Sequence, residues 1–354
     1  MKRLFLYLII LVLPALFTAC DVHEWPDVQA SVTLHLKLSY EKDMTVWKHL
    51  YDNAEVTGQG LGDTYANSRK HGRARYIIRA YPLTAGQSPT RKPARELVFT
   101  RDIADGYDCD VTFDIAPGDY HIMVWSDFAE NAGDTPFYNA DNFAEITLQG
   151  LHAGNNDYRD CFRGTSDISL KADINEADSA AAFEITMQRP VAKLEVITTD
   201  LAEFMEKEAT RIAAKNSDTQ SSAGAKPQTI VNTNDYEVVF KYIGFMPDTY
   251  SMFTDKPVDS STGVMFKSTL KKLNAGEASM GFDYLFVNGT ETAATVQIGL
   301  YDKDGTLLSL TEQIKVPLKR NRHTVLRGRF LMSKASGGIT INPDYDGDHN
   351  IIFP

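Results

Sequence analysis

The sequence predicts an all-β protein of two β-sandwich domains with one short helix. Short segments in which apolar and polar residues alternate recur along the chain, and a period of two is that of a half-buried strand. Turn dipeptides that contain Gly or Pro separate these segments, as in antiparallel sandwiches. The chain has 354 residues. Since a domain typically holds about 100–200 residues, two domains are expected.

The first segment is a bacterial lipoprotein signal. Lys2 and Arg3 precede an apolar core at residues 4–16, which has the length of a secretory signal and is short for a membrane span. The core ends in Leu16-Phe17-Thr18-Ala19-Cys20, which resembles the lipobox read by lipoprotein signal peptidase. We expect cleavage after Ala19, a lipid on Cys20 and a lipidated linker at residues 20–30. The alternative is an ordinary signal in which Cys20 follows by chance.

The charge and hydropathy of the remaining chain exclude some partners. Two of the 36 Lys and Arg residues and none of the 47 Asp and Glu residues precede Ala19, so cleavage shifts the net charge from −11 to −13. This charge disfavours nucleic acid and anionic membrane surfaces. No second apolar run reaches the roughly 18 residues of a membrane helix. The protein is therefore expected to be attached through its lipid alone.

Two cysteines, Cys109 and Cys161, follow Cys20. An oxidising envelope would allow a disulfide between them, which the chain-entropy model values at roughly 4 kcal/mol. Two separate buried thiols are the other interpretation, because a free cysteine often behaves as a small core residue. The sequence leaves both open.

The first half contains five predicted strands. Alternation is clearest where Val32, Leu34, Leu36 and Leu38 are interleaved with polar residues. The same period predicts strands at residues 74–80, 111–115, 120–124 and 183–187. Pro117-Gly118-Asp119 separates two of them and has the composition of a tight turn, which predicts a hairpin there.

The second half is expected to begin near Gln188-Arg189-Pro190, because one strand ends before this segment and Pro is disfavoured inside a central strand. The predicted domains are residues 31–188 and 189–354. Further strands are predicted at residues 192–196, 296–300, 314–318 and 324–330. Asn288-Gly289 and Asp304-Gly305 are dipeptides typical of hairpins.

One segment interrupts this pattern. From Leu201 the apolar residues follow helical spacing, and Asp200 with Glu203 three residues later has the composition of a helix cap. We predict a helix over residues 201–214 that covers a sheet face or edge, a structural role.

No motif predicts catalysis or a cofactor. The patterns of serine hydrolases, zinc proteases and phosphate-binding loops are absent, and the eight histidines lack metal-ligand spacing. Gly58, Gly60 and Gly62 lack the strand and helix of a nucleotide site. The acidic run at 344–348 resembles a calcium loop but has its glycine at the fourth position, so a solvated turn is favoured. We predict a protein that is not an enzyme and holds neither metal nor cofactor.

Several stretches resemble one known family, the fimbrillin-associated anchor lipoproteins of the type V fimbriae of Bacteroidales. They are residues 20–26 (CDVHEWP), 115–127 (IAPGDYHIMVWSD), 156–164 (NDYRDCFRG) and 188–196 (QRPVAKLEV), and the match is looser after about residue 200. The resemblance implies two tandem transthyretin-like Greek-key sandwiches, a lipid on Cys20 and a place at the base of a surface filament. It also implies contact with fimbrial shaft or accessory pilin subunits, which in that family join by exchange of a strand.

The leading hypothesis is therefore a structural lipoprotein, exposed at the outer membrane, that anchors or terminates a fimbria. Arg73, Arg75 and Arg79 lie near strand starts, and none of them is typical of the arginine at which shaft subunits are processed. A surface lipoprotein that binds a glycan or host ligand through its loops is the alternative, which exposed Trp25, Trp47 or Trp125 would favour. A secreted hydrolase is a third class. The β-prone residues 338–342 and 351–353 are expected to form a last strand or a subunit contact.

Overall fold

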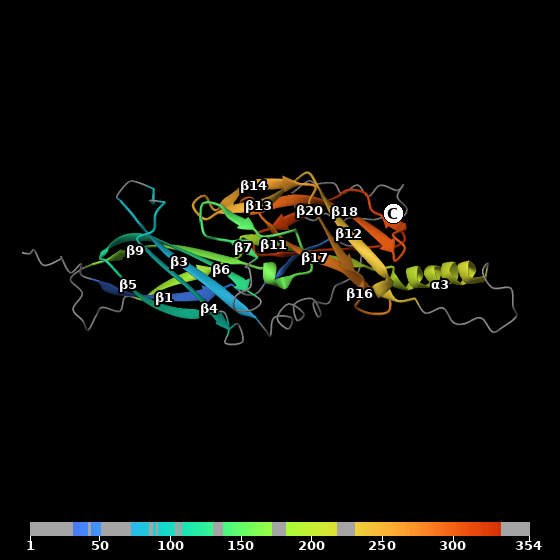
Figure 1. Ribbon diagram of the computed structural model, residues 1–354, viewed down its shortest axis with the longest axis horizontal. Helices are drawn as coiled ribbons and strands as arrows, with labels where there is room; N and C mark the ends of the chain where they lie inside the picture. The colour runs from blue at the N-terminus through green and yellow to red at the C-terminus, as the bar shows by residue number, and fades with distance from the viewer. Residues whose placement is uncertain are drawn as a thin grey trace, which may run out of the picture.

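The computed structural model confirms the all-β class. It describes residues 31–41, 44–50, 72–84, 88–89, 91–102, 106, 108–129, 137–171, 182–217 and 231–333. Strands dominate these residues, and the molecule is elongated (Figure 1). One α-helix and two 3-10 helices accompany the strands in the described ranges. None of the described helices is long and apolar enough to cross a membrane.

The first half is a sandwich of two sheets. Sheet A consists of β10 (Ala182–Met187), β1 (Val32–Tyr40) and β5 (Cys109–Ile115), in that spatial order. Sheet C consists of β4 (Arg95–Asp102), β3 (Arg73–Pro82), β6 (Gly118–Ala129) and β9 (Phe162–Leu170). The apolar rows of both sheets meet in a first core, which includes Leu34, Leu36, Ile78 and Ile122. The predicted first-half strands are thus present.

The second half is also a sandwich. Sheet B consists of β16 (Lys271–Lys272), β17 (Ala278–Phe286), β11 (Val191–Thr198), β21 (His323–Gly328) and β2 (Val46–Leu50). Sheet E consists of β15 (Met265–Thr269), β12 (Tyr236–Ile243), β18 (Glu291–Asp302) and β19 (Leu307–Leu310), and β20 (Ile314–Lys319) also pairs with β18. Between these sheets lies a second core, which includes Leu194, Val238, Ile298 and Val316.

A fifth sheet joins the halves. Sheet D consists of β14 (Lys256–Thr262), β13 (Phe245–Ser251), β8 (Ile146–Leu148) and β7 (Tyr138–Asn139), so two strands come from each half. It lies over the middle of the molecule (Figure 1). β2 of the first half pairs with β21 of the second. The division into domains at residues 188 and 189 stays a prediction.

One long bent hairpin, residues 236–269, contributes to both sheet E and sheet D. Its base, β12 with β15, belongs to sheet E, and its tip, β13 with β14, belongs to sheet D. Gly244 and Gly263 have φ angles of +91° and +69° at the bend, a left-handed region that favours glycine. The Tyr242 amide donates to the Val264 carbonyl at 2.9 Å, which continues the pairing across the bend.

The pairing differs from the predicted antiparallel pattern at two strand pairs. β1 pairs in parallel with β10, and β11 pairs in parallel with β21. In the first half, β1 at its start therefore lies beside β10 at its end, and in the second half β11 lies beside β21 in the same way. Alternation reports which face of a strand is buried and carries no information about the direction of its neighbour, so the sequence could not predict these pairs.

Two of the three predicted hairpins are wrong. β5 and β6, which flank Pro117-Gly118, belong to sheets A and C, so the chain crosses there from one layer to the other. β17 and β18 around Asn288-Gly289 likewise belong to sheets B and E. Only Asp304-Gly305 joins paired strands, β18 and β19. Turn residues fix the local backbone, and the partner of each strand is decided by tertiary packing.

The predicted helix is confirmed as α3 (Leu201–Ser217), which projects at the end of the molecule remote from sheets A and C (Figure 1). Leu201 and Phe204 are buried in the second core. The predicted cap is wrong in detail: the Asp200 carboxylate accepts from the backbone amides of Leu331 and Met332 at 3.3 and 2.9 Å. Glu203 pairs with Arg329 instead of the helix start.

Gly164 in β9 allows the two first-half sheets to approach each other. A Cβ atom there would lie 2.6 Å from Ile185 Cγ2 and 2.9 Å from the Thr186 carbonyl oxygen, both in β10. We expect Gly164→Ala to lower the free energy of unfolding by about 1–3 kcal/mol, the usual cost of overpacking. Urea unfolding measures it. Gly276→Ala is the control, because its Cβ would meet nothing closer than 3.9 Å; equal losses in both variants would contradict the packing argument.

Candidate assembly site and the junction of the halves

Several residues on which the predicted function depends lie outside the described part of the chain. The lipid site therefore stays a prediction, as do the roles of the C-terminal segments and of the acidic run. The residues concerned are Ala19, Cys20, Trp25, Gly58, Gly60, Gly62, 338–342, 344–348 and 351–353.

Cys109 and Cys161 are both buried and both free. Cys109 lies in β5 and belongs to the first core. Cys161 precedes β9 and packs with Trp125 and Tyr138 in a third group of buried residues between the halves, the junction core. Burial raises the pKa of the Cys161 thiol well above its usual value. The structure therefore corresponds to the second interpretation, two separate buried thiols.

The candidate assembly site is the outer edge of β5. Seven residue pairs, from Val32 with Ile115 to Leu38 with Cys109, join β5 to β1. On its other side β5 has no partner strand among the described residues. An edge of this kind presents unpaired backbone N–H and C=O groups, which are a template for another strand.

The core beneath this edge is incompletely covered. Cys109, Val111, Phe113 and Ile115 of β5 retain 5–8% exposure, whereas the inward residues of the central part of β1 retain 0–1%. Opposite β5 the sandwich ends in β4, where Leu97 and Phe99 are only partly buried against the first core. The other side of the sandwich is joined, because Arg163 of β9 and Gln188 after β10 exchange two backbone hydrogen bonds of 2.8 and 2.9 Å. The β4–β5 side is thus the more open one.

At the junction, a buried carboxylate from the second half meets Arg159 and His152 from the first. Asp283 of β17 accepts from Arg159 Nη1 at 2.9 Å and lies 2.6 Å from His152 Nε2. The hydroxyl of Tyr242 donates to the same carboxylate at 2.8 Å. Burial alone would raise the pKa of Asp283, but Arg159 and His152 outweigh it and hold the pKa below its usual value. Asp283 therefore stays ionised in the interior.

A second buried pair lies beside it. Arg189 Nε donates to both carboxylate oxygens of Asp160, at 2.8 and 2.9 Å, and the two side chains are 1% and 0% exposed. Arg189 Nη1 also donates to the Glu41 carbonyl and to Asn321 Oδ1. The predicted boundary residue is thus the centre of a hydrogen-bond network that contains residues of both halves.

The tip of the long hairpin forms a third connection. Asp255, in its turn, accepts from Arg163 of β9 and from Arg320 Nη1, the latter at 2.8 Å. The Tyr250 hydroxyl donates to the same carboxylate. Because the two arginines belong to different halves, the hairpin tip holds both.

Trp125 offers no exposed surface to a ligand, and the β3 arginines Arg75 and Arg79 are held in ion pairs. Trp125 is buried in the junction core, and its indole N–H donates to Asp127 at 3.0 Å. Arg75 donates to Asp127 through Nε at 2.8 Å, and Arg79 pairs with Glu96. β3 is covered on both faces, by the first core and the junction core, so its side chains do not alternate in exposure.

The described residues do not form a metal site, since none of them lie in a group of three or more His, Cys, Asp or Glu suited to an ion. The junction carboxylates already accept from arginine, tyrosine and histidine neighbours.

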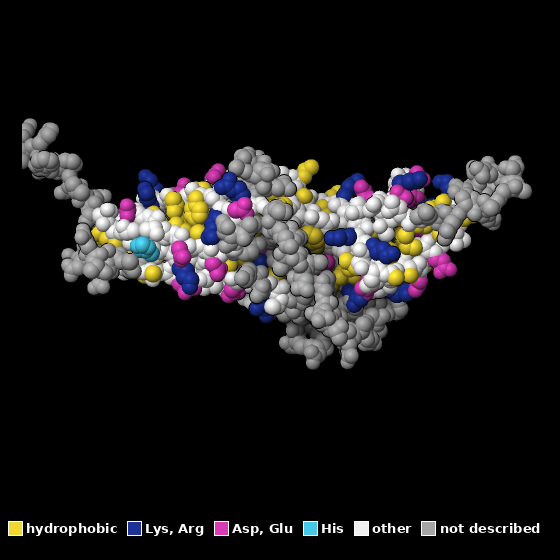
Figure 2. All heavy atoms as spheres, turned by 90° about the horizontal axis from the view of Figure 1, so that it is seen from below, with side chains coloured by type: hydrophobic (Ala, Val, Ile, Leu, Met, Phe, Trp, Pro, Cys, Tyr) yellow, Lys and Arg dark blue, Asp and Glu magenta, His cyan; other side chains and the backbone are white. Residues whose placement is uncertain are grey.

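On the face shown in Figure 2, acidic and basic side chains are interspersed among small hydrophobic groups. The junction could not be predicted from the sequence, because its charged residues are far apart in the chain and most of them, such as Arg159 and Arg189, lie between strands, where a polar residue is normally solvent-facing.

These features define an all-β protein of two sandwiches joined by a shared sheet and buried ion pairs. The chain belongs to a family of unknown function (DUF6562), whose model matches residues 27–354. None of the curated proteins matches it.

Solved structures are similar at low identity. The fimbrial anchor protein Mfa2 of Porphyromonas gingivalis has 12% identity and a TM-score of 0.33, with 79% of this chain and 82% of that chain covered. A fimbrial assembly protein of Parabacteroides distasonis has 12% identity and a TM-score of 0.38, with 84% and 91% covered. A candidate polysaccharide-binding protein of Bacteroides thetaiotaomicron has 9% identity and a TM-score of 0.40, with 79% of each chain covered.

Proposed function

We propose that this protein is a lipid-anchored subunit at the outer membrane that anchors or terminates a fimbria. In this proposal a strand of a fimbrial subunit adds to the open edge of β5. The observation that carries it is the combination of an unpaired β5 edge with an incompletely covered core between β4 and β5. An added strand would satisfy the backbone groups of β5 and place alternate side chains against Leu97 and Phe99, which is the physics of β-strand addition.

The strand-addition step is tested by site-specific photocrosslinking in cells that make fimbriae. Thr112 is an exposed, outward-facing residue of β5, and Glu184 is an exposed residue of β10 at the opposite edge of sheet A. A photoreactive residue at position 112 is expected to crosslink to a fimbrial subunit, and the same residue at position 184 is not. Equal crosslinking at both positions, or crosslinking at 184 alone, would rule out the β5 edge.

The lipid anchor predicts a loss of membrane association in Cys20→Ser. A diacylated N-terminus anchors a protein stably, and removal of the acceptor thiol removes both chains. We expect wild-type protein to incorporate labelled palmitate and to sediment with outer membranes, and Cys20→Ser to do neither. Cys109→Ser is the control, because Cys109 is a buried core thiol. A Cys20→Ser protein that still carries label would contradict the assignment.

The anchoring role itself is tested by deletion of the gene. If the protein holds a filament at its base, deletion should release filaments into the medium, and shearing of wild-type cells should leave the protein with the envelope. Filaments that stay firmly attached to the deletion strain would remove this role.

A further inference from the structure

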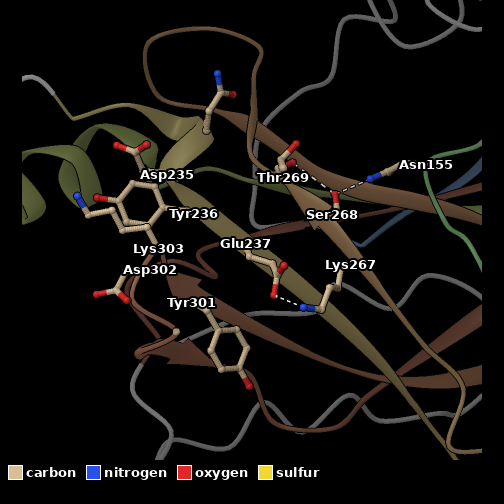
Figure 3. A pocket seen from close by; sticks show the side chains of 12 residues that line it. Asn155, Asp235, Tyr236, Glu237, Lys267, Ser268, Thr269, Tyr301, Asp302 and Lys303 are labelled. Carbon is tan, nitrogen blue, oxygen red and sulfur yellow. Dashed lines mark hydrogen bonds and ion pairs between the residues drawn. The ribbon is translucent and has the colours of Figure 1, made fainter.

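The outer face of sheet E carries a polar hollow of about 630 Å³, at the ends of β12, β15 and β18 (Figure 3). This volume is within the range of small-molecule sites, roughly 300–1,000 Å³. Thr269, Glu237 and Tyr301 form one row across the three strands, because Glu237 pairs in register with each of the other two. Their side chains point away from the second core, and the hollow is remote from the β5 edge.

Tyr301 supplies an aromatic surface to this hollow. A Cβ atom built on Gly299, two residues earlier on the same face of β18, would lie 3.0 Å from Tyr301 Cε2 and 3.5 Å from its Cζ. The ring therefore lies against the backbone of Gly299, in space that any other residue would occupy. The side chain is half-buried, and its hydroxyl has no hydrogen-bond partner among the described residues. One face of the ring is thus supported by the sheet and the other is open to the hollow.

The Tyr301 ring stands at one end of the hollow, and the polar groups lie to one side of it (Figure 3). Glu237 and Lys267 form an ion pair with an O–N distance of 2.9 Å (Figure 3). The side chains of Asp235, Thr269 and Lys303 have no hydrogen-bond or ion-pair partner in the described part of the chain. The wall is fixed, because Asn155 Nδ2 donates to Ser268 Oγ at 2.5 Å and Asn155 Oδ1 accepts from the Phe282 amide at 2.8 Å.

From this arrangement we infer that the hollow binds a neutral sugar residue of an oligosaccharide or polysaccharide. The C–H face of a pyranose packs on an open aromatic ring, and its hydroxyls both donate and accept hydrogen bonds. Glu237 and Asp235 accept from hydroxyls, and Lys267 and Lys303 donate to them. Because Asp235, Glu237 and Asp302 are nearly balanced by the two lysines, the hollow does not favour a strongly charged ligand. This site is independent of the proposed anchoring at β5.

The test is direct binding of maltohexaose, cellohexaose and mannohexaose to the purified protein, measured by isothermal titration calorimetry. Heparin is included as a polyanion for comparison. We expect at least one neutral hexasaccharide to bind and heparin not to bind. Tyr301→Ala is expected to lower that affinity about tenfold, whereas Tyr301→Phe keeps it, because the ring and not the hydroxyl forms the contact. Gly299→Ala, which displaces the ring, is expected to weaken binding as well.

Phe245→Ala is the matched control, because Phe245 is an aromatic residue 77% exposed on another part of the surface. It should bind like wild type. Unchanged melting temperatures show that Tyr301→Ala and Phe245→Ala are folded. The inference is overturned if Tyr301→Ala binds as well as wild type, if heparin alone binds, or if no neutral hexasaccharide binds at about 1 mM.

Discussion

Asp160→Ala is expected to lower the free energy of unfolding by about 3–5 kcal/mol, the usual cost of removing one partner of a buried ion pair. The substitution leaves the Arg189 guanidinium in a site where its side chain is 1% exposed. Arg189 also contacts the Glu41 carbonyl, Asn321 Oδ1 and the Phe162 ring, and these groups are uncharged. The measurement is urea unfolding of the purified protein at neutral pH.

The double variant Asp160→Ala with Arg189→Met separates the charge from the packing. If the loss in Asp160→Ala comes from an unpaired buried charge, removal of that charge should restore part of the stability, because apolar replacements of buried pairs are often neutral. A double variant that is less stable by the sum of both single losses would show that the pair is not coupled.

Asp283→Asn is expected to cost a similar 3–5 kcal/mol at pH 7 and to flatten the dependence of stability on acid pH. The pKa of Asp283 is lower in the folded protein than in an unfolded chain, because Arg159 and His152 outweigh the effect of burial. A depressed folded-state pKa contributes stability that is present above the unfolded pKa, near 4, and is lost as the pH falls through the folded pKa. The stabilities of the wild type and Asp283→Asn should therefore approach each other only as the pH falls below about 4 and through the lower folded-state pKa of Asp283.

Asp127→Asn is the matched comparison. Asp127 is an equally buried carboxylate that accepts from Arg75 and Trp125, but burial outweighs these partners and raises its pKa. Its ionised form is thus disfavoured by folding, so the asparagine should cost only about 1 kcal/mol. Its contribution to stability should also change in the opposite direction as the pH falls. Equal losses and equal pH profiles for the two variants would contradict the proposed electrostatics of the junction.

The buried face of a strand and the position of the helix were predictable from the sequence. The alternation around Leu34 and Leu36 predicts β1, and the spacing from Leu201 predicts α3, because both patterns follow from local geometry. Strand partners were not predictable. Pro117-Gly118 and Asp304-Gly305 have similar turn chemistry, yet one crosses between sheets and the other closes a hairpin. The choice depends on long-range packing that no short segment contains.

The candidate sites were less accessible to sequence reasoning. Thr269, Glu237 and Tyr301 are distant in sequence and meet only through strand register. Asp283 and Arg159 are likewise 124 residues apart. Gly299 gave no signal, because its role is to leave room for a neighbouring ring. The signal that was available for the junction is the charged residue placed within an apolar strand, such as Asp283 between Phe282 and Tyr284.

The long bent hairpin makes the two sandwiches one mechanical body. β13 of the hairpin pairs with β8, and Asp255 at its tip holds arginines of both halves. Any tilt of one sandwich against the other would break backbone hydrogen bonds and separate buried charges at the same time. A force on either sandwich would therefore be carried to the other through backbone hydrogen bonds and ion pairs, so the two sandwiches would turn together as a single lever arm.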